Sequence, residues 1–303
     1  MKHSAFRIHH KVQDALNHKK PIVALESTII SHGMPYPQNL DTAFEVEQVV
    51  MDHGALPATI AVIDGVIHVG CGEAELEKIS KAVAVRKLSI RDLALAQVQN
   101  AHGGTTVAAT MHIASLLGIR CFASGGIGGV HRGFEKHGDI SADLDALSRY
   151  GMVVVCAGIK AILDIPRTME MLESLSIPVI CYREDEFPAF FMRKSGLKSP
   201  QRLDEPKEFA EVRKSMDELR LTQSILVANP IAKGNALNQK IGENAIAKAL
   251  EDAEQEGVFG KDQTPFLLQR TNELTGGESL RSNIELIKSN AALCGEIAVQ
   301  MYR

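Results

Sequence analysis

The sequence has few of the features that mark a secreted, zinc-cluster or membrane protein. Its five cysteines are an odd number, are widely spread and include no Cys-x-x-Cys pair, so neither a disulfide framework nor a zinc cluster is expected. No run approaches the ~18 apolar residues of a transmembrane helix, and residues 1–20 lack the apolar stretch of a signal peptide. We therefore expect a cytoplasmic protein with no membrane partner and with reduced, mostly buried thiols.

An excess of basic charge is also missing. The chain carries 33 Lys and Arg against 37 Asp and Glu, a formal net charge of −4, which gives no field to hold a nucleic-acid polymer. Any nucleic-acid chemistry should therefore act on a small nucleotide. No internal repeat, low-complexity tract or proline-rich linker divides the 303 residues, so we expect one domain covering 1–303.

Short apolar runs alternate with segments of helical period. The runs predict strands at 22–25, 59–63, 66–69, 119–123, 152–157, 179–182 and 225–228. The segments predict helices at 42–51, 73–82, 105–117, 142–148, 168–175, 243–256 and 280–301, and the charged stretch 200–220 predicts a solvated helix. This alternation indicates an α/β fold, with a largely parallel central sheet and helices on both faces. Asp64-Gly65 predicts a small antiparallel hairpin within it.

Polar residues directly after the apolar runs are the candidates for chemistry, because ligands of open α/β sheets bind beyond the carboxyl ends of the strands. Glu26 follows the run 22–25, where burial would favour a protonated carboxyl that acts as a general acid. A carboxylate that caps a nearby turn is an equal alternative. Lys160 follows the run 152–157 and precedes an expected short helix at 161–163, whose dipole would favour a neutral amine. Such an amine suits Schiff-base chemistry, although an exposed loop lysine is the commoner case.

Two glycine-containing stretches are candidate sites for an anion or a sugar. The glycines of 124–133 let backbone amides approach a ligand closely. His131 stands where the last glycine of a dinucleotide fingerprint would be, so this is not that motif. The stretch 103–106 is expected to open a helix, and its amides and hydroxyls would form either a phosphate site or a simple helix cap.

Asp139 and Asp143 lie four residues apart with Ser141 between them. Carboxylate oxygens are hard ligands suited to Mg²⁺ or Mn²⁺, usually with waters that complete the octahedron. The same pattern also fits the N-terminal cap of a helix.

Taken together, these stretches resemble the pseudouridine-5'-phosphate glycosidases, also called the indigoidine-synthase-A-like family. The resemblance covers nearly the whole chain and is carried by ALESTIISHGMP at 24–35, PATIA at 57–61, GTTVA at 104–108, GGIGGVHRG at 125–133, DISADL at 139–144, VCAGIK at 155–160, VANPI at 227–231, TPFLL at 264–268 and ELTGGESL at 273–280. Ser124 and Ala161 depart from the family pattern, in which threonine and serine are common.

The resemblance implies a reversible cleavage of the C-glycosidic bond of pseudouridine 5'-phosphate to uracil and D-ribose 5-phosphate. Lys160 matches the nucleophile, which forms a Schiff base, and Glu26 matches the proton donor. The resemblance also implies a homotrimer with one Mn²⁺ per subunit, bound by Asp139. The positions that match substrate-binding residues are Lys87, Thr106, Val107, His131, Ser141, Ala142, Asp143 and Asn283.

Two other functions fit the same residues. A Schiff-base aldolase or lyase that acts on another sugar phosphate would also need Lys160, a carboxylic acid and a phosphate site. A non-catalytic protein that binds a metabolite of the pathway would keep the fold without turnover. Release of free uracil from pseudouridine 5'-phosphate distinguishes the first function from both.

Overall fold

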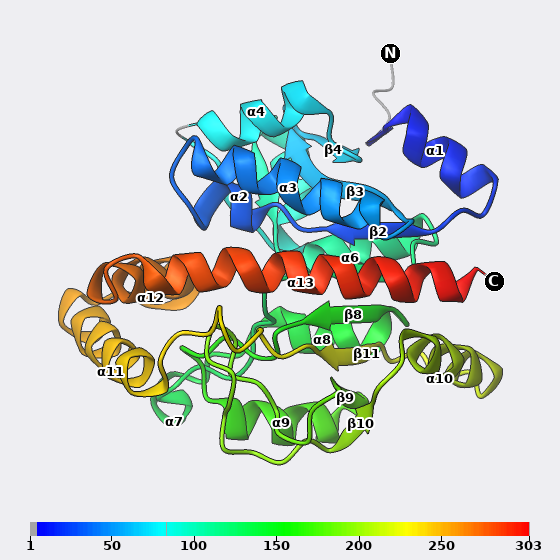
Figure 1. Cartoon of the computed structure of the whole chain (residues 1–303). Helices are drawn as coiled ribbons and strands as arrows, with labels where there is room; N and C mark the ends of the chain where they lie inside the picture. The colour runs from blue at the N-terminus through cyan, green and yellow to red at the C-terminus, as the bar shows by residue number, and fades with distance from the viewer. Residues whose placement is uncertain (1–4, 83, 303) are drawn as a thin grey trace.

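One mixed sheet runs through the protein, for which a computed structural model describes residues 5–82 and 84–302 (Figure 1). Along the sheet the strands follow the order β1 (Phe6–Ile8), β4 (Val66–Val69), β3 (Leu56–Ile63), β2 (Ile22–Leu25), β7 (Cys121–Ala123), β8 (Val153–Cys156), β11 (Ile225–Ala228), β9 (Val179–Tyr182) and β10 (Gln201–Leu203). Two further strands, β5 (Arg86–Leu88) and β6 (Gly103–Thr105), extend it beside β3.

The pairing of the strands confirms the predicted fold class. Two ladders are antiparallel, β3 with β4 and β3 with β6, and the remaining ladders between the described strands are parallel. The hairpin between β3 and β4 turns at Asp64 and Gly65, whose φ angles are 50° and 73°. Both angles are positive, as the two-residue turn requires.

Helices cover both faces of the sheet. On one face α13 (Glu278–Met301) contacts β2, β7 and β8 and packs against α3 (Gln38–Asp52) and α10 (Pro206–Glu218); on the other, α6 (Val107–Leu116) packs against α8 (Ala142–Arg149). The remaining helices are α1 (His10–Asn17), α2 (Thr28–His32), α4 (Glu73–Lys81), α5 (Leu93–Val98), α7 (Phe134–His137), α9 (Ile165–Ser174), α11 (Gln239–Glu256) and α12 (Gln263–Leu274), with 3₁₀ turns at Ile90–Asp92 and Gly260–Asp262. Among the described helices, none is long and apolar enough to cross a membrane.

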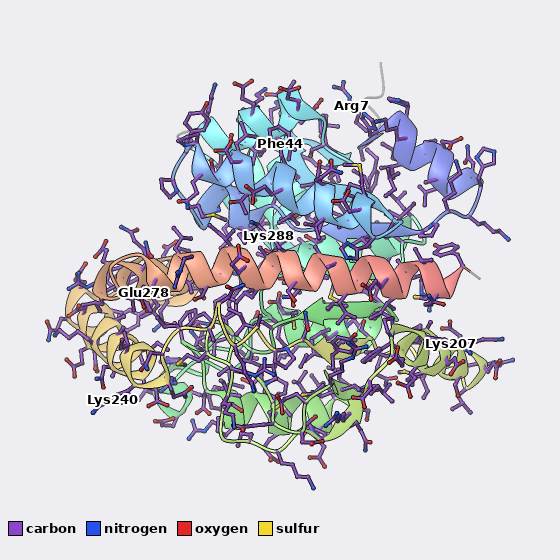
Figure 2. All side chains as sticks on the ribbon, in the orientation of Figure 1. Arg7, Phe44, Lys207, Lys240, Glu278 and Lys288 are labelled. Carbon is purple, nitrogen blue, oxygen red and sulfur yellow. The ribbon has the colours of Figure 1, made fainter. Side chains whose placement is uncertain are left out.

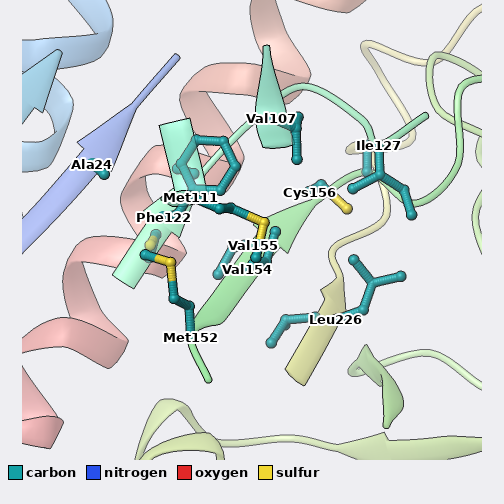
Figure 3. Close-up of a cluster of buried hydrophobic side chains, with 14 of the residues drawn as sticks. Ala24, Val107, Met111, Phe122, Ile127, Met152, Val154, Val155, Cys156 and Leu226 are labelled. Atoms are coloured by element: carbon teal, nitrogen blue, oxygen red, sulfur yellow. The ribbon is translucent and has the colours of Figure 1, made fainter. Parts of the chain in front are cut away.

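The core lies where the central strands meet these helices. Phe122 of β7, Val154 of β8, Leu226 of β11 and Met111 of α6 are all fully buried and lie in one cluster (Figure 3). Strands that are covered on both faces have no polar side to expose, which is why their sequences are continuous apolar runs. The five cysteines are also buried and free, as expected.

Helix α13 crosses the middle of the molecule and joins its two halves (Figure 1). Lys288 on this helix points toward α3 (Figure 2), where its Nζ lies 2.5 Å from Oε2 of Glu45. The predicted solvated helix at 200–220 is α10, but the prediction was wrong for one face of it. Phe209 and Arg213 are fully buried there, because α10 packs on α13.

Candidate active site

The carboxyl ends of β2, β7 and β8 open into one cavity. The register of β2 and β7 pairs Leu25 with Ala123, so the next residues, Glu26 and Ser124, leave the sheet side by side. Beyond β7 and β8 the chain continues as two adjacent loops, joined by bonds from the Ile127 amide to the Gly158 carbonyl (3.1 Å) and from the Lys160 amide to the Ile127 carbonyl (3.1 Å). The cavity is lined by Glu26, Lys87, Lys160 and Asn283, among others.

The carboxylate of Glu26 is clamped by two hydroxyl groups. It is only 8% exposed. Thr28 donates a hydrogen bond to its Oε2, and Ser124 donates one to its Oε1. Both partners are side-chain hydroxyls and not the amides of a helix or turn, so the cap interpretation of Glu26 is not supported.

A buried polar network lies beneath Glu26 and includes Thr105, a residue of the predicted phosphate site. The hydroxyl of Ser27 donates to the Ile60 carbonyl (2.6 Å) and accepts from the Thr105 amide (2.9 Å). Residues 103–105 form strand β6 and do not open a helix, so that part of the prediction was wrong. The helix begins one step later, where Thr106 caps α6 by accepting from the Ala109 amide at 3.3 Å.

Lys160 lies in the cavity, but not at the start of a helix. Residues 161–163 form a turn, closed by a bond from the Leu163 amide to the Lys160 carbonyl at 2.9 Å. Helix α9 begins only at Ile165, after Asp164 accepts from the Arg167 amide at 3.1 Å. The predicted effect of a helix dipole on Lys160 was therefore wrong. The guanidinium of Arg132 holds this turn by donating to the Leu163 and Ala161 carbonyls, both at 3.2 Å.

A second lysine shares the cavity. Burial lowers the pKa of Lys87, and the positive charge of Lys160 lowers it further, while Asp143, Glu26 and Asp262 oppose the shift. An anionic ligand would be attracted by both cations in this partly enclosed space.

A wider cleft adjoins this cavity and shares Glu26, Lys87 and Lys160 with it. Besides these three, it contains seven more of the residues predicted from the sequence, whereas Asn283 lines the first cavity and not this cleft. These seven are Thr106, Val107, His131, Asp139, Ser141, Ala142 and Asp143.

Asp143 and Ser141 hold backbone groups at the floor of this cleft. Oδ1 of Asp143 accepts from the Ala108 amide (2.9 Å) and Oδ2 accepts from the Gly128 amide (2.8 Å). Ser141 caps α8 by accepting from the amide of Asp143 at 3.2 Å. The helix-cap interpretation of this segment is thus confirmed, and Asp143 ties the glycine-rich loop to the start of α6.

Asp139 is the predicted metal ligand. Its Oδ2 lies 3.9 Å from Nδ1 of His131, which bonds Oε1 of Gln263 at 2.6 Å. Burial lowers the pKa of His131, and the nearby Asp139 and Gln263 oppose this. Within residues 5–82 and 84–302, no cluster of three or more His, Cys, Asp or Glu side chains is placed to hold a metal ion. A divalent ion at Asp139 would thus depend on water or substrate for its other ligands.

Asn283 presents an acceptor to the cavity. It is 9% exposed, and its Oδ1 has no hydrogen-bond partner in the part of the chain that the structure describes. A buried acceptor without a partner costs about 1–3 kcal/mol, which a ligand donor would recover. A Cβ at Gly125 would lie 3.2 Å from this oxygen, so glycine leaves room for it.

The sequence did not reveal several residues that shape the site. Phe190 lines the cavity beside Gly126, where a Cβ would lie 2.7 Å from the ring, and Thr264 and Pro265 at the start of α12 close another side. Asn290, one position in the middle of a long helix, binds the loop after β7. Among the segments that hold such residues, only 227–231 and 264–268 could be found from the sequence, and only through the family resemblance.

Comparisons with known proteins identify the family. The model of the family described as "Indigoidine synthase A like protein" matches residues 11–300. Pseudouridine-5'-phosphate glycosidase 2 of Rhizobium johnstonii is 50% identical over 97% of this chain and 95% of its own length. Pseudouridine-5'-phosphate glycosidase of Caldanaerobacter subterraneus is also 50% identical, over 96% of this chain and 95% of its own length.

Two solved structures share the fold over nearly the full length. An indigoidine synthase A-like protein from Thermotoga maritima has a TM-score of 0.90 and 34% identity, and the match covers 100% of this chain and 99% of that one. A prealnumycin C-glycosynthase in complex with ribulose 5-phosphate has a TM-score of 0.90 and 33% identity, covering 98% of this chain and 97% of that one.

Proposed function

The chain belongs to the indigoidine synthase A-like family, and we propose that it reversibly cleaves the C-glycosidic bond of pseudouridine 5'-phosphate, giving uracil and D-ribose 5-phosphate. The observation that carries this proposal is the shared cavity of Glu26, Lys87 and Lys160. It combines an acid, an amine nucleophile and a second lysine in one space, and the relatives that match over nearly their whole length are named for this reaction.

The substrate explains why an amine is needed. Pseudouridine joins its base through carbon, so the base cannot leave on a nitrogen that accepts the charge. In the proposed route the Glu26 carboxyl gives a proton to the ribose ring oxygen as the sugar opens, and the Lys160 amine bonds to C1'. The bond between C1' and the uracil carbon then breaks, its electron pair stays with the base, and that carbon takes a proton. Water hydrolyses the remaining imine and returns the Lys160 amine.

The other residues of the site would bind and orient the substrate. Lys87, Thr106 and Val107 line the wider cleft, and we assign them to the phosphate or the sugar hydroxyls. The acceptor of Asn283 fits an N–H donor of the uracil ring. Asp143 would act through the loop that it supports, because both of its oxygens already accept backbone amides.

We also propose Asp139 as the residue that holds a Mn²⁺ ion, one per subunit, beside His131. A bound divalent ion would supply positive charge and ordered waters at the edge of the cleft. A site with a single carboxylate is one that binds its metal weakly, in line with the absence of a three-residue cluster among the described residues.

Borohydride trapping with ribose 5-phosphate tests the nucleophile. Reduction should fix a pentose phosphate on Lys160, located by mass mapping, and Lys160→Ala should abolish both the adduct and uracil release. Lys87→Ala is the matched control, since at high ribose 5-phosphate it should keep the adduct on Lys160. An adduct on another residue, or an active Lys160→Ala enzyme, would reject the route.

Incubation with pseudouridine 5'-phosphate separates this function from a Schiff-base aldolase or a non-catalytic binding protein. Free uracil should appear in step with ribose 5-phosphate, and the reverse reaction should consume uracil.

We further propose that the protein is cytoplasmic, in keeping with the five free thiols, and that it forms a homotrimer. Sedimentation analysis of the purified protein would reject the trimer by finding a monomer or dimer at micromolar concentration.

A further inference from the structure

Two asparagines outside the cavity connect helix α13 to the acid Glu26. Asn290 is fully buried on α13, and its Nδ2 donates to the carbonyls of Ser124 (2.8 Å) and Gly125 (3.3 Å). Its Oδ1 accepts from Nδ2 of Asn229 at 3.0 Å. Ser124 then donates its hydroxyl to Oε1 of Glu26, so a continuous chain of hydrogen bonds runs from Asn229 to the carboxylate.

We propose that Asn290 and Asn229 are positioning residues for the cleavage reaction, which hold the Ser124 backbone so that its hydroxyl fixes the Glu26 carboxyl in its productive orientation. The inference rests on the proposed function, because it assigns Glu26 the role of the acid. Neither asparagine lines the cavity, so both act through Ser124 and not by touching substrate.

The direction of each bond supports this role. An amide side chain can be turned either way, and the donor from Asn229 to Oδ1 of Asn290 leaves the NH₂ of Asn290 facing the two carbonyls. The amide of Ser124 is fixed as well, since it donates to the Val155 carbonyl of β8 at 3.0 Å. Both backbone groups of Ser124 therefore have hydrogen-bond partners. These two bonds fix the backbone of Ser124 and thereby the position of its hydroxyl.

The same helix serves the other side of the cavity. Asn283 and Asn290 are two helical turns apart on α13, so one helix face presents Asn283 to the cavity and Asn290 to the loop beneath it. Gly125 lies between them, next to Oδ1 of Asn283 and bonded to Nδ2 of Asn290. A shift of this loop would move the acid, Glu26, relative to Asn283, which we assign to the uracil ring.

The test measures two steps separately in Asn290→Ala. Cleavage of pseudouridine 5'-phosphate needs Glu26 to open the ring, whereas ribose 5-phosphate opens unaided in water and supplies its own aldehyde to Lys160. We expect kcat for cleavage to fall about 10- to 100-fold, the scale of a misplaced catalytic group, with KM changed by less than about threefold. Borohydride trapping of ribose 5-phosphate on Lys160 should remain close to wild type.

Asn229→Ala is the milder variant and keeps the proposal testable if Asn290→Ala does not fold. It should lower kcat in the same direction, and the double variant should fall no further than Asn290→Ala, because both residues act through one bond. Asn235→Ala is the control: it removes a bond from Asn235 to Glu285 of the same helix (3.1 Å) and should leave kcat unchanged.

The outcomes are distinct. If cleavage and trapping fall together, the positioning role is overturned and the fold is generally damaged. An unchanged kcat in folded Asn290→Ala would also overturn the positioning role. Failure of the wild-type protein to release uracil would instead reject the proposed function itself. Thermal unfolding of every variant shows which ones are folded at the assay temperature.

Discussion

Ser124 and Glu26 lie 98 positions apart in the chain, yet the hydroxyl of Ser124 donates directly to a carboxylate oxygen of Glu26. The contact follows from the sheet, since Leu25 and Ala123 are register partners in the parallel ladder of β2 and β7. Thr28, only two residues from Glu26, bonds the other oxygen. The acid is therefore held by one local contact and one that exists only when the two strands have paired.

This clamp predicts that Ser124→Ala lowers kcat for cleavage by up to about tenfold, since a hydrogen bond that orients the neutral acid is worth about 0.5–1.5 kcal/mol. Ser124→Thr retains the hydroxyl and should keep near wild-type activity. Uracil release measured by absorbance compares the two. Equal rates for Ser124→Ala and wild type would show that the Ser124 bond has no part in orienting Glu26.

Lys87 gives a prediction for pH and stability. Because the pKa of its amine is lowered in the folded state, the unfolded chain binds more protons between that pKa and the ordinary ~10.4. The free energy of unfolding therefore rises with pH through this window, and below it the buried charge destabilises the fold in full. We expect Lys87→Met to be more stable than wild type at pH 7 and to lose this rise.

The same variant should bind ribose 5-phosphate about 10- to 100-fold more weakly, because it lacks a charge-assisted hydrogen bond. Urea unfolding at pH 7 and pH 10 and calorimetric titration measure the two effects. Lys78→Met is the control, since Lys78 is an exposed partner of Asp64 and should change neither by much. A less stable Lys87→Met protein with intact affinity would contradict the assigned role.

The central fold was predictable because its signals are local. The strands β2, β4, β9 and β11 have the predicted bounds, since each is a buried apolar run between turn residues. The strands that were not predicted, β1, β5, β6 and β10, are three residues each. They exist through pairing with strands distant in sequence, and a three-residue segment has no periodicity of its own.

The same limit applies to the site: its local signals could be read from the sequence, and its long-range contacts could not. Residues at strand ends could be found from the sequence, and Glu26 and Lys160 do line one cavity. The helix expected at 161–163 failed, although its signal was present: Asp164 as a cap and Pro166 in the first turn place the helix start at Ile165. The role of Asn290 could not be predicted, because nothing in a helical pattern shows which distant carbonyl a buried amide will bind.

Asp143 should be more important for folding than for binding. Asn at this position can accept only one of the two backbone amides, and its NH₂ would face the other N–H, so we expect Asp143→Asn to lower the free energy of unfolding by about 1–3 kcal/mol. Asp145→Asn is the matched control on the same helix, because Asp145 makes an exposed ion pair with Arg149 at 2.7 Å and should cost little. Urea unfolding that shows equal losses for the two variants would contradict this account.

The metal gives the last prediction. A single carboxylate from Asp139 holds a divalent ion weakly, so dialysis against a chelator should remove both the ion and the activity, and added Mn²⁺ should restore them. Asp139→Asn should need at least about tenfold more Mn²⁺ for half-maximal activity, while Asp145→Asn should match wild type. Binding of Mn²⁺ can be followed without turnover, because the free hydrated ion loses its paramagnetic resonance signal when it binds. Full activity in excess chelator, or equal Mn²⁺ binding by wild type and Asp139→Asn, would show that Asp139 has no metal to hold and acts only on the buried His131 beside it.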